Sequence, residues 1–319
     1  MRSPTGTPVP RRALSVVLLL VSAIFLACGS DGAGSASPSA PTTNPEFPVT
    51  IEAANGSITI EERPAAIVSL SPTATEILFA IEAGEQVAAV DDQSSYPAEA
   101  PTTDLSGYEP NVEAIASYEP DLVVLSDDLG GIIEALDKIA IPVIEHPAAA
   151  DLEDTYGQIE QLGDATGHPA EADELVSSMR SEIEDVVATV PEFDSAPIYF
   201  HELDDTYFTA TSDTFIGQVY SLLGLENIAD EAKGASSGYV QLSQEYIIES
   251  DPDLIFLADT KCCAQDAASV AKRPGWRSIA AVQEGGVVPM DDDIASRWGP
   301  RIVDFLRRAA DAVAGLQES

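Results

Sequence analysis

Hydrophobic residues alternate between two spacings along most of the chain. Short, almost uninterrupted apolar runs are typical of strands buried in a parallel sheet, and they occur at residues 67–70, 87–90, 122–125, 143–145, 198–200, 254–257 and 287–290. Helical spacing of apolar residues is found between these runs, at residues 73–80, 112–117, 132–139, 215–223, 242–248, 276–282 and 302–313. Strands that alternate with helices predict an α/β fold with mainly parallel sheets and helices on both faces.

Two local signals add detail near the start of this pattern. Asn55-Gly56 lies between apolar stretches and predicts the turn of a β-hairpin over residues 47–60. Thr73 is followed three residues later by Glu76, which is the pattern of a capping box. We therefore expect the first helix to begin at Thr73, with Glu76 bonded back to its first turn.

A single long helix is predicted between the two halves of the chain. Apolar residues recur at helical spacing from Leu175 to Val190, Pro169 suits a first helical turn, and Pro191 suits a stop. Such a helix has about 22 residues and spans ~33 Å. One stiff connection of this kind predicts only a small movement of the two halves, whereas loose linkers would permit a wide hinge motion.

One fifteen-residue stretch occurs twice. The sequence EAIASYEPDLVVLSD at residues 113–127 returns as EYIIESDPDLIFLAD at residues 245–259, with seven of the fifteen positions identical. Each copy predicts a short helix, a Pro-Asp stop, a buried strand and an acidic turn. The repeat indicates two lobes of similar build with a shared cleft, each carrying a glutamate, Glu113 or Glu245, at an equivalent place. The alternative is two unrelated units that share a common turn signal.

The N-terminus has the features of an export signal. Arg11 and Arg12 precede an apolar run, Leu14 to Ala27, that is too short to span a bilayer comfortably. The run ends at Ala27-Cys28, which resembles a bacterial lipobox and implies that Cys28 is the lipidated first residue of the mature protein. The alternative is an ordinary signal peptide that is cleaved nearby. We expect an exported protein, lipid-anchored to the outer face of the cell membrane.

These features divide the chain into five parts. We expect a lipoprotein signal peptide at residues 1–27, a flexible tether rich in Gly, Ser, Ala, Pro and Thr at 28–46, and an N-terminal lobe at 47–167. A linking helix at 168–191 and a C-terminal lobe at 192–319 complete the chain. The predicted fold class is thus α/β, with two lobes of mainly parallel sheets joined by a single long helix.

Charge excludes several classes of partner. The formal net charge is −39 at pH 7, and it becomes −42 once the signal peptide leaves, because that segment has three arginines and no acidic residue. A field of this sign opposes binding to nucleic acid, which requires basic residues, and adsorption to anionic lipid headgroups. We therefore expect no nucleic acid partner and membrane contact through the lipid anchor only.

Cysteine and histidine usage argues against a metal centre or a hydrolase. Cys262 and Cys263 are adjacent, without the spacing of a zinc or thioredoxin-like motif, so a vicinal disulfide and a pair of thiols both stay open. Three histidines are few for a receptor of free zinc or manganese ions. Residues 234–238 match the G-x-S-x-G pattern, but no histidine follows His201, as the hydrolase order requires. We expect no enzymatic activity, no cofactor and no directly bound metal.

Several segments taken together resemble the periplasmic binding proteins of iron-chelate and vitamin B12 importers. They are IVSLSPTATEILFAI, the Tyr-Pro at 96–97, NVEAI, PDLVVLSD, FTATSDTFIGQVYSLLGLENI, VQLSQEYIIESDPDLIFLAD and DDDIASRWGPRIVDFL, in collinear order over residues 47–315. The resemblance implies the helical-backbone fold of that family. It also implies a monomeric receptor that captures an iron or cobalt chelate in its cleft and delivers it to an ABC permease dimer with its ATPase.

The resemblance assigns roles to the two repeated glutamates. In that family, one glutamate on each lobe pairs with arginines on the two halves of the permease, and Glu113 and Glu245 fall at those motif positions. A two-fold permease needs two similar contacts, which a pseudo-symmetric receptor supplies. The alternative is that both are exposed acids at helix starts, stabilised by the helix dipole.

The same resemblance indicates the residues that line the ligand cleft, namely Tyr96, Tyr108, Phe208, Tyr239, Asp293 and Arg297. Aromatic faces suit a flat, largely apolar chelate whose orientation is fixed by a few polar groups. As alternatives, Phe208 and Tyr239 are core residues, and Asp293 and Arg297 are a surface pair one helical turn apart. Trp298 either lines the cleft or covers the core.

Few cations are available to such a cleft. Arg297 and Arg301 are the basic candidates, whereas a tri-anionic ferric catecholate requires several converging cations. Cobalamin, or a neutral or cationic ferric hydroxamate, therefore fits better. Cys262 and Cys263 follow the strand at 254–257, at the end of the sheet where α/β proteins bind ligands, and a disulfide there would offer a rigid apolar ledge. The remaining alternatives are a surface lipoprotein with a sensory or structural role and a receptor of free metal ions.

Overall fold

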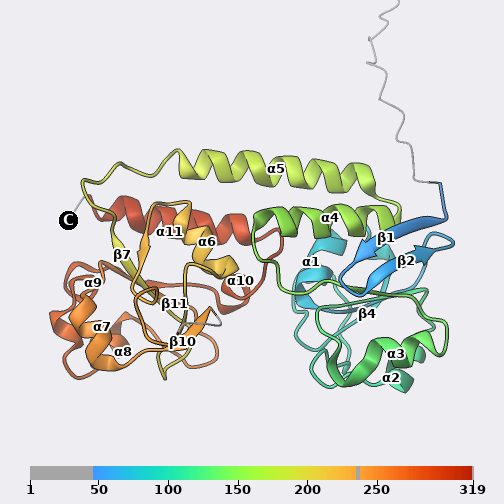
Figure 1. Ribbon diagram of the computed structural model, residues 1–319, viewed down its shortest axis with the longest axis horizontal. Coiled ribbons are helices and arrows are strands. Elements are labelled where there is room, and N and C mark those ends of the chain that lie inside the picture. Colours follow the sequence, from blue (N-terminus) through green and yellow to red (C-terminus); the bar gives the residue numbers. More distant parts are fainter. Residues whose placement is uncertain (1–45, 235–237, 318–319) are drawn as a thin grey trace, which may run out of the picture. The chain divides into compact units, whose positions relative to one another are not determined.

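Two four-stranded sheets form the centres of two lobes (Figure 1). The computed structural model describes residues 46–234 and 238–317, all of which belong to one compact unit, Thr42–Ser319. The N-terminal sheet has the order β4 (Val87–Val90), β3 (Ile67–Leu70), β5 (Leu122–Leu125) and β6 (Val143–Glu145). The C-terminal sheet has the order β12 (Val287–Pro289), β11 (Leu254–Leu257), β7 (Ile198–Glu202) and β9 (Glu226–Asn227). Every pairing within these two sheets is parallel, as the sequence predicts.

Helices connect the strands in each lobe. The N-terminal lobe contains α1 (Pro72–Ala80), α2 (Val112–Ala116), α3 (Ile132–Asp137) and α4 (Leu152–Thr166), with 3₁₀ turns at Gly84–Gln86 and Leu129–Gly131. The C-terminal lobe contains α6 (Phe215–Ser221), α7 (Gln244–Ser250), α8 (Ala267–Val270), α9 (Ala280–Glu284), α10 (Asp292–Ala295) and α11 (Ile302–Gly315). The helix predicted at 276–282 is divided into a 3₁₀ turn, Trp276–Ser278, and α9, because Ile279 between them is extended.

The long helix between the lobes is α5 (Pro169–Val187), which ends slightly earlier than the predicted 169–190. It lies along α4 of the N-terminal lobe and α11 of the C-terminal lobe (Figure 1). A Cβ on Gly163 of α4 would come within 2.5 Å of the Ala172 Cβ of α5, so these two helices pack very closely. One hydrophobic core cluster includes Ile77 of α1, Met179 of α5 and Phe305 of α11. The connection is therefore part of the core rather than a tether, which confirms the prediction of a single joining helix.

Two predictions near the N-terminus are wrong in detail. In the hairpin of β1 (Val49–Ala53) and β2 (Gly56–Ile60), Ala53 pairs with Gly56, so the turn is Ala54-Asn55, one residue earlier than predicted. The capping box at Thr73 does not form. Ser71 is the N-cap of α1, its Oγ accepts a hydrogen bond from the Ala74 N–H at 3.3 Å, and Pro72 begins the helix.

The sequence repeat corresponds to equivalent parts of the two lobes. β5 lies between β3 and β6, and β11 lies between β7 and β12, so each repeated strand has the same place in its sheet. Asp121 Oδ2 accepts the Ala65 and Ala66 N–H groups just before β3, at 2.8 and 3.0 Å. Asp253 Oδ2 accepts the Ile198 N–H at the start of β7, at 2.8 Å. The Pro-Asp stop thus fixes the neighbouring strand in each lobe, which favours similar lobes over a coincidental turn signal.

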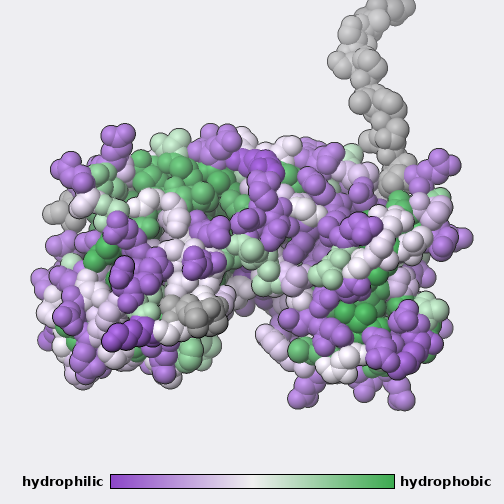
Figure 2. Space-filling model, viewed as in Figure 1, coloured by the Kyte–Doolittle hydropathy of each residue, from purple (hydrophilic) through white to green (hydrophobic). Residues whose placement is uncertain are grey.

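Several elements were not predicted. The β8 (Phe208–Ala210) and β10 (Tyr239–Gln241) strands form a small antiparallel pair in the C-terminal lobe, which the hydrophobic pattern does not predict. The pattern does not predict α4 either, because Gly157 and Gly163 dilute its apolar face. Hydrophilic side chains cover most of the face drawn in Figure 2, and apolar ones gather beside α5 and α11. In the part of the chain that the structure describes, no helix is long and apolar enough to cross a membrane.

Candidate ligand cleft

Two adjoining cavities, of about 680 and 350 Å³, are lined by residues of both lobes. They share Ala148, Ser296, Arg297 and Trp298. The larger cavity continues along C-terminal residues that include Leu203, Phe215 and Tyr239, and the smaller along N-terminal residues that include Ser71, Asp91 and Tyr108. The surface is visibly hollowed between the lobes in Figure 2. This pair of cavities is hereafter the cleft. A cavity of about 1060 Å³ between the hairpin and α3 contains none of the predicted ligand-binding residues.

The aromatic residues predicted for the cleft are exposed. Tyr108 is 75% exposed and Tyr239 is 49% exposed, and both line the cleft from different lobes. Phe208, at 41%, begins β8, and Tyr239 begins β10, the strand paired with it. The alternative that Phe208 and Tyr239 are core residues is therefore wrong. Tyr96 and Phe208 do not themselves line either cavity, so of the four aromatics only two are brought to the cleft wall.

Trp298 lines the cleft, which decides between the two roles that the sequence left open. Its Nε1 donates a hydrogen bond of 2.8 Å to Gln158 Oε1 on α4. A buried or half-buried indole needs such a partner for its N–H group. The bond to α4 attaches this residue of the C-terminal segment to the N-terminal lobe and fixes the indole at the cleft wall.

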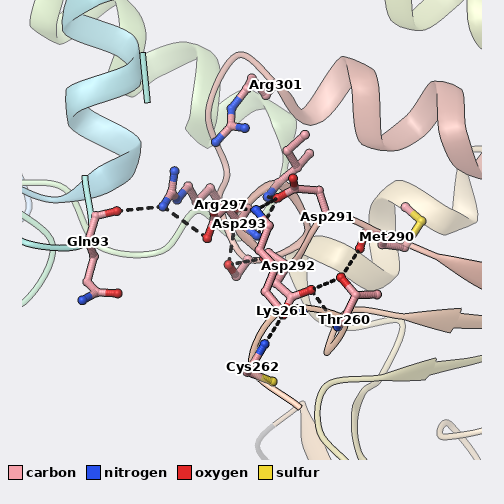
Figure 3. A network of polar contacts seen from close by, with 12 residues as sticks. Gln93, Thr260, Lys261, Cys262, Met290, Asp291, Asp292, Asp293, Arg297 and Arg301 are labelled. Atoms are coloured by element: carbon pink, nitrogen blue, oxygen red, sulfur yellow. Dashed lines mark hydrogen bonds and ion pairs between the residues drawn. The ribbon is translucent and has the colours of Figure 1, made fainter. Parts of the chain in front are cut away.

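Arg297 lines both cavities, but its guanidinium is largely occupied, and Figure 3 shows its contacts with Gln93 and Asp293. Nη1 donates to Glu76 Oε1 at 2.7 Å, and Nη2 donates to the Gln93 carbonyl at 2.9 Å. Nη2 also lies 3.6 Å from Asp293 Oδ1. The Arg297 side chain is only 9% exposed. It is therefore not half of an isolated surface pair with Asp293, because its main partners belong to the other lobe.

Glu76 does not belong to a capping box, as its spacing from Thr73 predicts, but is the buried partner of two arginines. Its side chain is 1% exposed and lies on the buried face of α1. Arg301 donates from Nε to Glu76 Oε2 at 2.8 Å and from Nη2 to Oε1 at 2.5 Å. The Arg301 guanidinium also lies over the Tyr96 ring, 4.3 Å from its centre. An acid flanked by apolar residues in the sequence TEILFA was an available signal for a buried charge, but the capping-box pattern obscured it.

The turn that leads into α10 binds the loop that follows β11 (Figure 3). Asp292 accepts the Thr260, Lys261 and Cys262 N–H groups at 2.8, 2.8 and 3.0 Å. Lys261 Nζ donates to Asp291 Oδ1 at 2.7 Å and to Asp293 Oδ2 at 2.9 Å. Burial alone would raise the pKa of Asp292, but the hydrogen bonds from Thr260 and from these N–H groups lower it below its ordinary value. The loop therefore holds a charged α10 start in place beside the cleft.

Cys262 and Cys263 are free thiols within this loop. Cys262 is exposed and Cys263 is half-buried, and neither lines the cleft. Desolvation, followed by the hydrogen bond to the Cys263 thiol, raises the pKa of Cys262 to about 12. Because the thiolate is the reactive form, this environment slows oxidation at neutral pH.

A buried acidic pair lies at the ends of β7 and β11. Glu202 and Asp259 are both fully buried, and Arg273 donates to Glu202 at 2.6 and 2.5 Å. No donor among the described residues bonds to the Asp259 carboxylate, whereas a protonated Asp259 can share its proton with Glu202 in a hydrogen bond. Burial, and then the nearby charge of Glu202, raises the pKa of Asp259 to about 8. Asp259 therefore holds a proton at neutral pH and makes the folded state sensitive to alkali.

The structure places the two repeated glutamates at matching positions. Glu113 is the second residue of α2 and Glu245 is the second residue of α7. The N-caps are Asn111, which accepts the Ala114 N–H at 2.9 Å, and Ser243, which accepts the Tyr246 N–H at 3.2 Å. Both glutamates are exposed. Both carboxylates are therefore at exposed helix starts of the same build in each lobe.

Comparison with known proteins agrees with this geometry. The model of the family described as periplasmic binding protein matches residues 67–294. The chain belongs to the periplasmic binding protein family. An uncharacterized ABC transporter substrate-binding lipoprotein of Bacillus subtilis, YvrC, is 30% identical to this periplasmic binding protein over 313 residues, which cover 95% of this chain and 97% of the relative. A cobalamin-binding protein of Halobacterium salinarum is 32% identical over 275 residues, covering 83% of this chain and 74% of the relative.

Solved structures match the same architecture. A periplasmic solute-binding protein of Staphylococcus epidermidis, described as possibly iron-binding, aligns with a TM-score of 0.69 and 26% identity over 79% of this chain and 99% of that one. The vitamin B12-binding protein of Vibrio cholerae aligns with a TM-score of 0.67 and 23% identity over 80% of this chain and 99% of that one. These likenesses confirm the predicted α/β fold of two lobes joined by one helix.

Family membership also fixes the general role. This periplasmic binding protein is a substrate-binding protein of the ABC-transporter type, which carries a small molecule and acts with a permease and an ATPase. The family consists of carriers that do not catalyse reactions, which confirms the expectation that the chain is not an enzyme. Residues 235–237 of the G-x-S-x-G match lie outside the described part of the chain.

Proposed function

We propose that this periplasmic binding protein is the receptor of an ABC importer and that it binds a metal chelate in the cleft between its lobes. The observation that supports this most is the pair of exposed tyrosines on opposite lobes, Tyr108 and Tyr239, which line adjoining cavities on either side of Trp298. Aromatic faces on two sides suit a flat, bulky ligand.

The charges of the cleft narrow the class of chelate. Asp91, Asp127, Asp213 and Asp293 line it, and the one basic side chain among its lining residues is Arg297. Because Arg297 is paired with Glu76, it offers little free charge to a ligand. An acidic cleft of this kind favours cobalamin or a neutral or cationic ferric chelate over a tri-anionic catecholate. The relatives named as binding cobalamin in Halobacterium salinarum and vitamin B12 in Pectobacterium carotovorum give cobalamin the first place among these.

Docking to the permease is proposed to use Glu113 and Glu245. Both are exposed second residues of equivalent helices, and they belong to the two copies of one sequence repeat. Two similar acidic contacts suit a permease built from two equivalent halves.

The anchor is proposed to be Cys28, with residues 28–46 as the tether, and the receptor to act as a monomer. Residues 1–45 lie outside the described part of the chain, so the support for an anchor is the sequence together with the Bacillus subtilis relative, which is named a lipoprotein. A lipid on Cys28 would keep the receptor at the outer face of the membrane, close to its permease.

Neither alternative role gains support. Among the described residues, no group of three or more His, Cys, Asp or Glu side chains could hold a metal ion, which removes the main requirement of a free-ion receptor. Nothing in the described lobes favours a purely sensory or structural lipoprotein over a carrier.

The proposal is tested by fluorescence titration of the protein lacking its signal and Cys28. Trp298 lines the cleft, and Trp276, the other tryptophan, is fully buried in the C-terminal lobe, so quenching reports mainly on the cleft. Cyanocobalamin, ferrioxamine B, ferric enterobactin and haem are added in turn, with free tryptophan correcting the inner-filter effect. Saturable quenching below about 1 µM by one of them supports the receptor role. Silence from all four, with the protein folded, contradicts it.

A further inference from the structure

Among the described residues, Arg297 is the one basic side chain that lines the cleft. Its guanidinium is bound by Glu76, a buried carboxylate that is distant in sequence. Arg297 lines both cavities, yet its guanidinium donates to Glu76 and to the Gln93 carbonyl. Glu76 is 221 residues away in sequence and is 1% exposed. The side chain that faces the ligand is thus held by a residue that does not line the cleft.

Both oxygens of Glu76 are used. Oε1 accepts from Arg297 and from Arg301, and Oε2 accepts a second bond from Arg301 at 2.8 Å. Asp293 lies 3.6 Å from Arg297 on the other side. We call these four residues, Glu76, Asp293, Arg297 and Arg301, the Glu76 cluster. Its two carboxylates balance its two guanidinium groups, so the cluster presents no net charge to the cleft.

We propose that Glu76 is a specificity-determining residue: by binding Arg297 it withholds a cation from the cleft and so excludes anionic chelates. The inference rests on the proposed role of the cleft in chelate binding. Arg297 makes one charge-assisted hydrogen bond to Glu76 and a second bond to the Gln93 carbonyl, and together they fix the orientation of its guanidinium. Without Glu76, the Arg297 guanidinium loses its main acidic partner and becomes available to an anionic ligand in the cleft.

A purely structural role for Glu76 makes a different prediction. If Glu76 only joined the lobes, any loss of its contacts would lower the affinity for every ligand to a similar extent. Arg301→Gln provides this comparison, because it removes contacts of Glu76 but leaves the bond between Glu76 and Arg297 intact. The ratio of affinities for anionic and neutral chelates therefore distinguishes a role in specificity from a purely structural role of Glu76.

The test measures the dissociation constants of cyanocobalamin, ferrioxamine B and ferric enterobactin, which are neutral, cationic and tri-anionic, for four proteins. These are the wild type, Glu76→Gln, Arg301→Gln and the double variant Glu76→Gln/Arg301→Gln. The double variant is included because Glu76→Gln alone leaves two guanidinium groups facing each other, whereas the double change removes one charge of each sign. Glu85→Gln, an exposed acid on the 3₁₀ turn after α1, is the matched control.

We expect the affinity for ferric enterobactin relative to cyanocobalamin to rise about tenfold or more in both proteins that carry Glu76→Gln. The ratio should stay at the wild-type value or fall in Arg301→Gln, and stay unchanged in Glu85→Gln. An unchanged ratio in both Glu76→Gln proteins overturns the proposal. An equal rise in Arg301→Gln also overturns it, since loosening of the lobes would then be the cause.

A ligand-free measurement keeps the inference separate from the proposed function. Phenylglyoxal modifies accessible arginine side chains, and mass spectrometry of peptides reports the rate at Arg297. We expect slow modification of Arg297 in the wild type and in Arg301→Gln, and fast modification in both Glu76→Gln proteins. This result would support the inference that Glu76 withholds Arg297 from the cleft, even if no chelate binds. Equal rates in all four overturn it. Failure of every chelate to bind the wild type would contradict the proposed function alone.

Discussion

Arg301 donates two hydrogen bonds to Glu76, one from Nε to Oε2 at 2.8 Å and one from Nη2 to Oε1, across 225 residues of sequence. Arg301 is the residue before α11 of the C-terminal lobe, and Glu76 is on α1 of the N-terminal lobe. Besides α5, which runs along one side, the Glu76 cluster and the Trp298–Gln158 hydrogen bond thus join the lobes near the cleft. The small lobe movement expected from the helical connection stays a prediction, and this second joint favours it.

Loss of the Glu76 charge should destabilise the fold strongly. Glu76→Gln leaves Arg297 and Arg301 as largely buried cations without their main partner, and breaking a buried pair in this way costs about 3–5 kcal/mol. Urea unfolding monitored by circular dichroism measures the change. Glu85→Gln, which removes an exposed charge with no ion-pair partner among the described residues, should change the free energy of unfolding by less than about 0.5 kcal/mol. A loss below about 1 kcal/mol for Glu76→Gln would show that the cluster contributes little.

Stability should depend on pH through Asp259. Its pKa is raised from 3.8 to about 8 in the folded protein, so between these values the folded state holds a proton that the unfolded state has released. The stabilisation is complete below pH 3.8 and is lost as the pH rises towards 8, by up to about 1.4 kcal/mol per pH unit. Asp259→Asn keeps a neutral side chain and should therefore lose this part of the pH dependence.

Other groups also titrate in this range. The free energy of unfolding of Asp259→Asn is therefore compared with that of the wild type at each pH. Burial lowers the pKa of His146 and His201 to about 4, so their contribution runs the other way: it is present above pH 6.5 and is lost as the pH falls towards 4. Both histidines are common to the wild type and Asp259→Asn and cancel. Unfolding free energies at pH 5, 6, 7 and 8 should favour Asp259→Asn increasingly as the pH rises. A constant difference would mean that Asp259 is ionised throughout.

Docking should fail without loss of ligand affinity when the repeated glutamates are removed. Glu113→Ala and Glu245→Ala each delete one exposed carboxylate, and the double variant deletes both. Uptake of the radiolabelled chelate by cells or by reconstituted permease should fall at least about tenfold in the double variant. Binding by the isolated receptor should be unchanged. Glu109→Ala and Glu249→Ala, exposed acids near the same helices, are the matched controls and should transport normally. Normal uptake in the double variant would contradict docking through this pair.

The adjacent cysteines are proposed to close a vicinal disulfide under oxidising conditions. Because Asp292 holds the Cys262 N–H, a disulfide would stiffen the loop that positions α10 and, through Asp293, Arg297. Oxidation of the wild type by hydroxyethyl disulfide, confirmed by thiol titration, should change the affinity for the bound chelate about two- to tenfold relative to the reduced protein. Cys262→Ser cannot close the disulfide, and its remaining thiol, Cys263, forms at most a mixed disulfide with the reagent; Cys262→Ser/Cys263→Ser has neither thiol and should not respond. If the oxidised wild type, the reduced wild type and Cys262→Ser bind the chelate with equal affinity, the cysteines have no effect on ligand binding.

The sequence was sufficient for the parallel strands because each is a short apolar run between turn signals, and such runs are set locally. Four of the seven predicted strands, at 67–70, 87–90, 122–125 and 143–145, form one complete sheet with the predicted bounds. β8 and β10 were not predicted because each has only three residues, which is too short for an alternation of exposed and buried positions to be recognised.

The site was harder to predict because it depends on pairs distant in sequence. Tyr108 and Tyr239 reach the cleft as the family resemblance implies, whereas Tyr96 instead lies beside Arg301 and Phe208 stays outside the two cavities. Glu76 fits the local sequence pattern of a helix start. No residue near it in the sequence indicates that two arginines more than two hundred residues away both bind its carboxylate. Pairing of this kind is a tertiary property, and only the fold brings the three side chains together.

Calorimetric titration of cyanocobalamin into the wild type, Tyr108→Ala, Tyr239→Ala and Tyr118→Ala tests the claim that the cleft binds one metal chelate between its two lobes. Tyr118 is a partly exposed tyrosine outside the cleft and serves as the control. We predict one site per chain, a dissociation constant below about 1 µM, and a loss of about 1–3 kcal/mol of binding free energy for each cleft variant but not for Tyr118→Ala. Heat that does not saturate, or affinity that is the same in all four proteins, would contradict the claim.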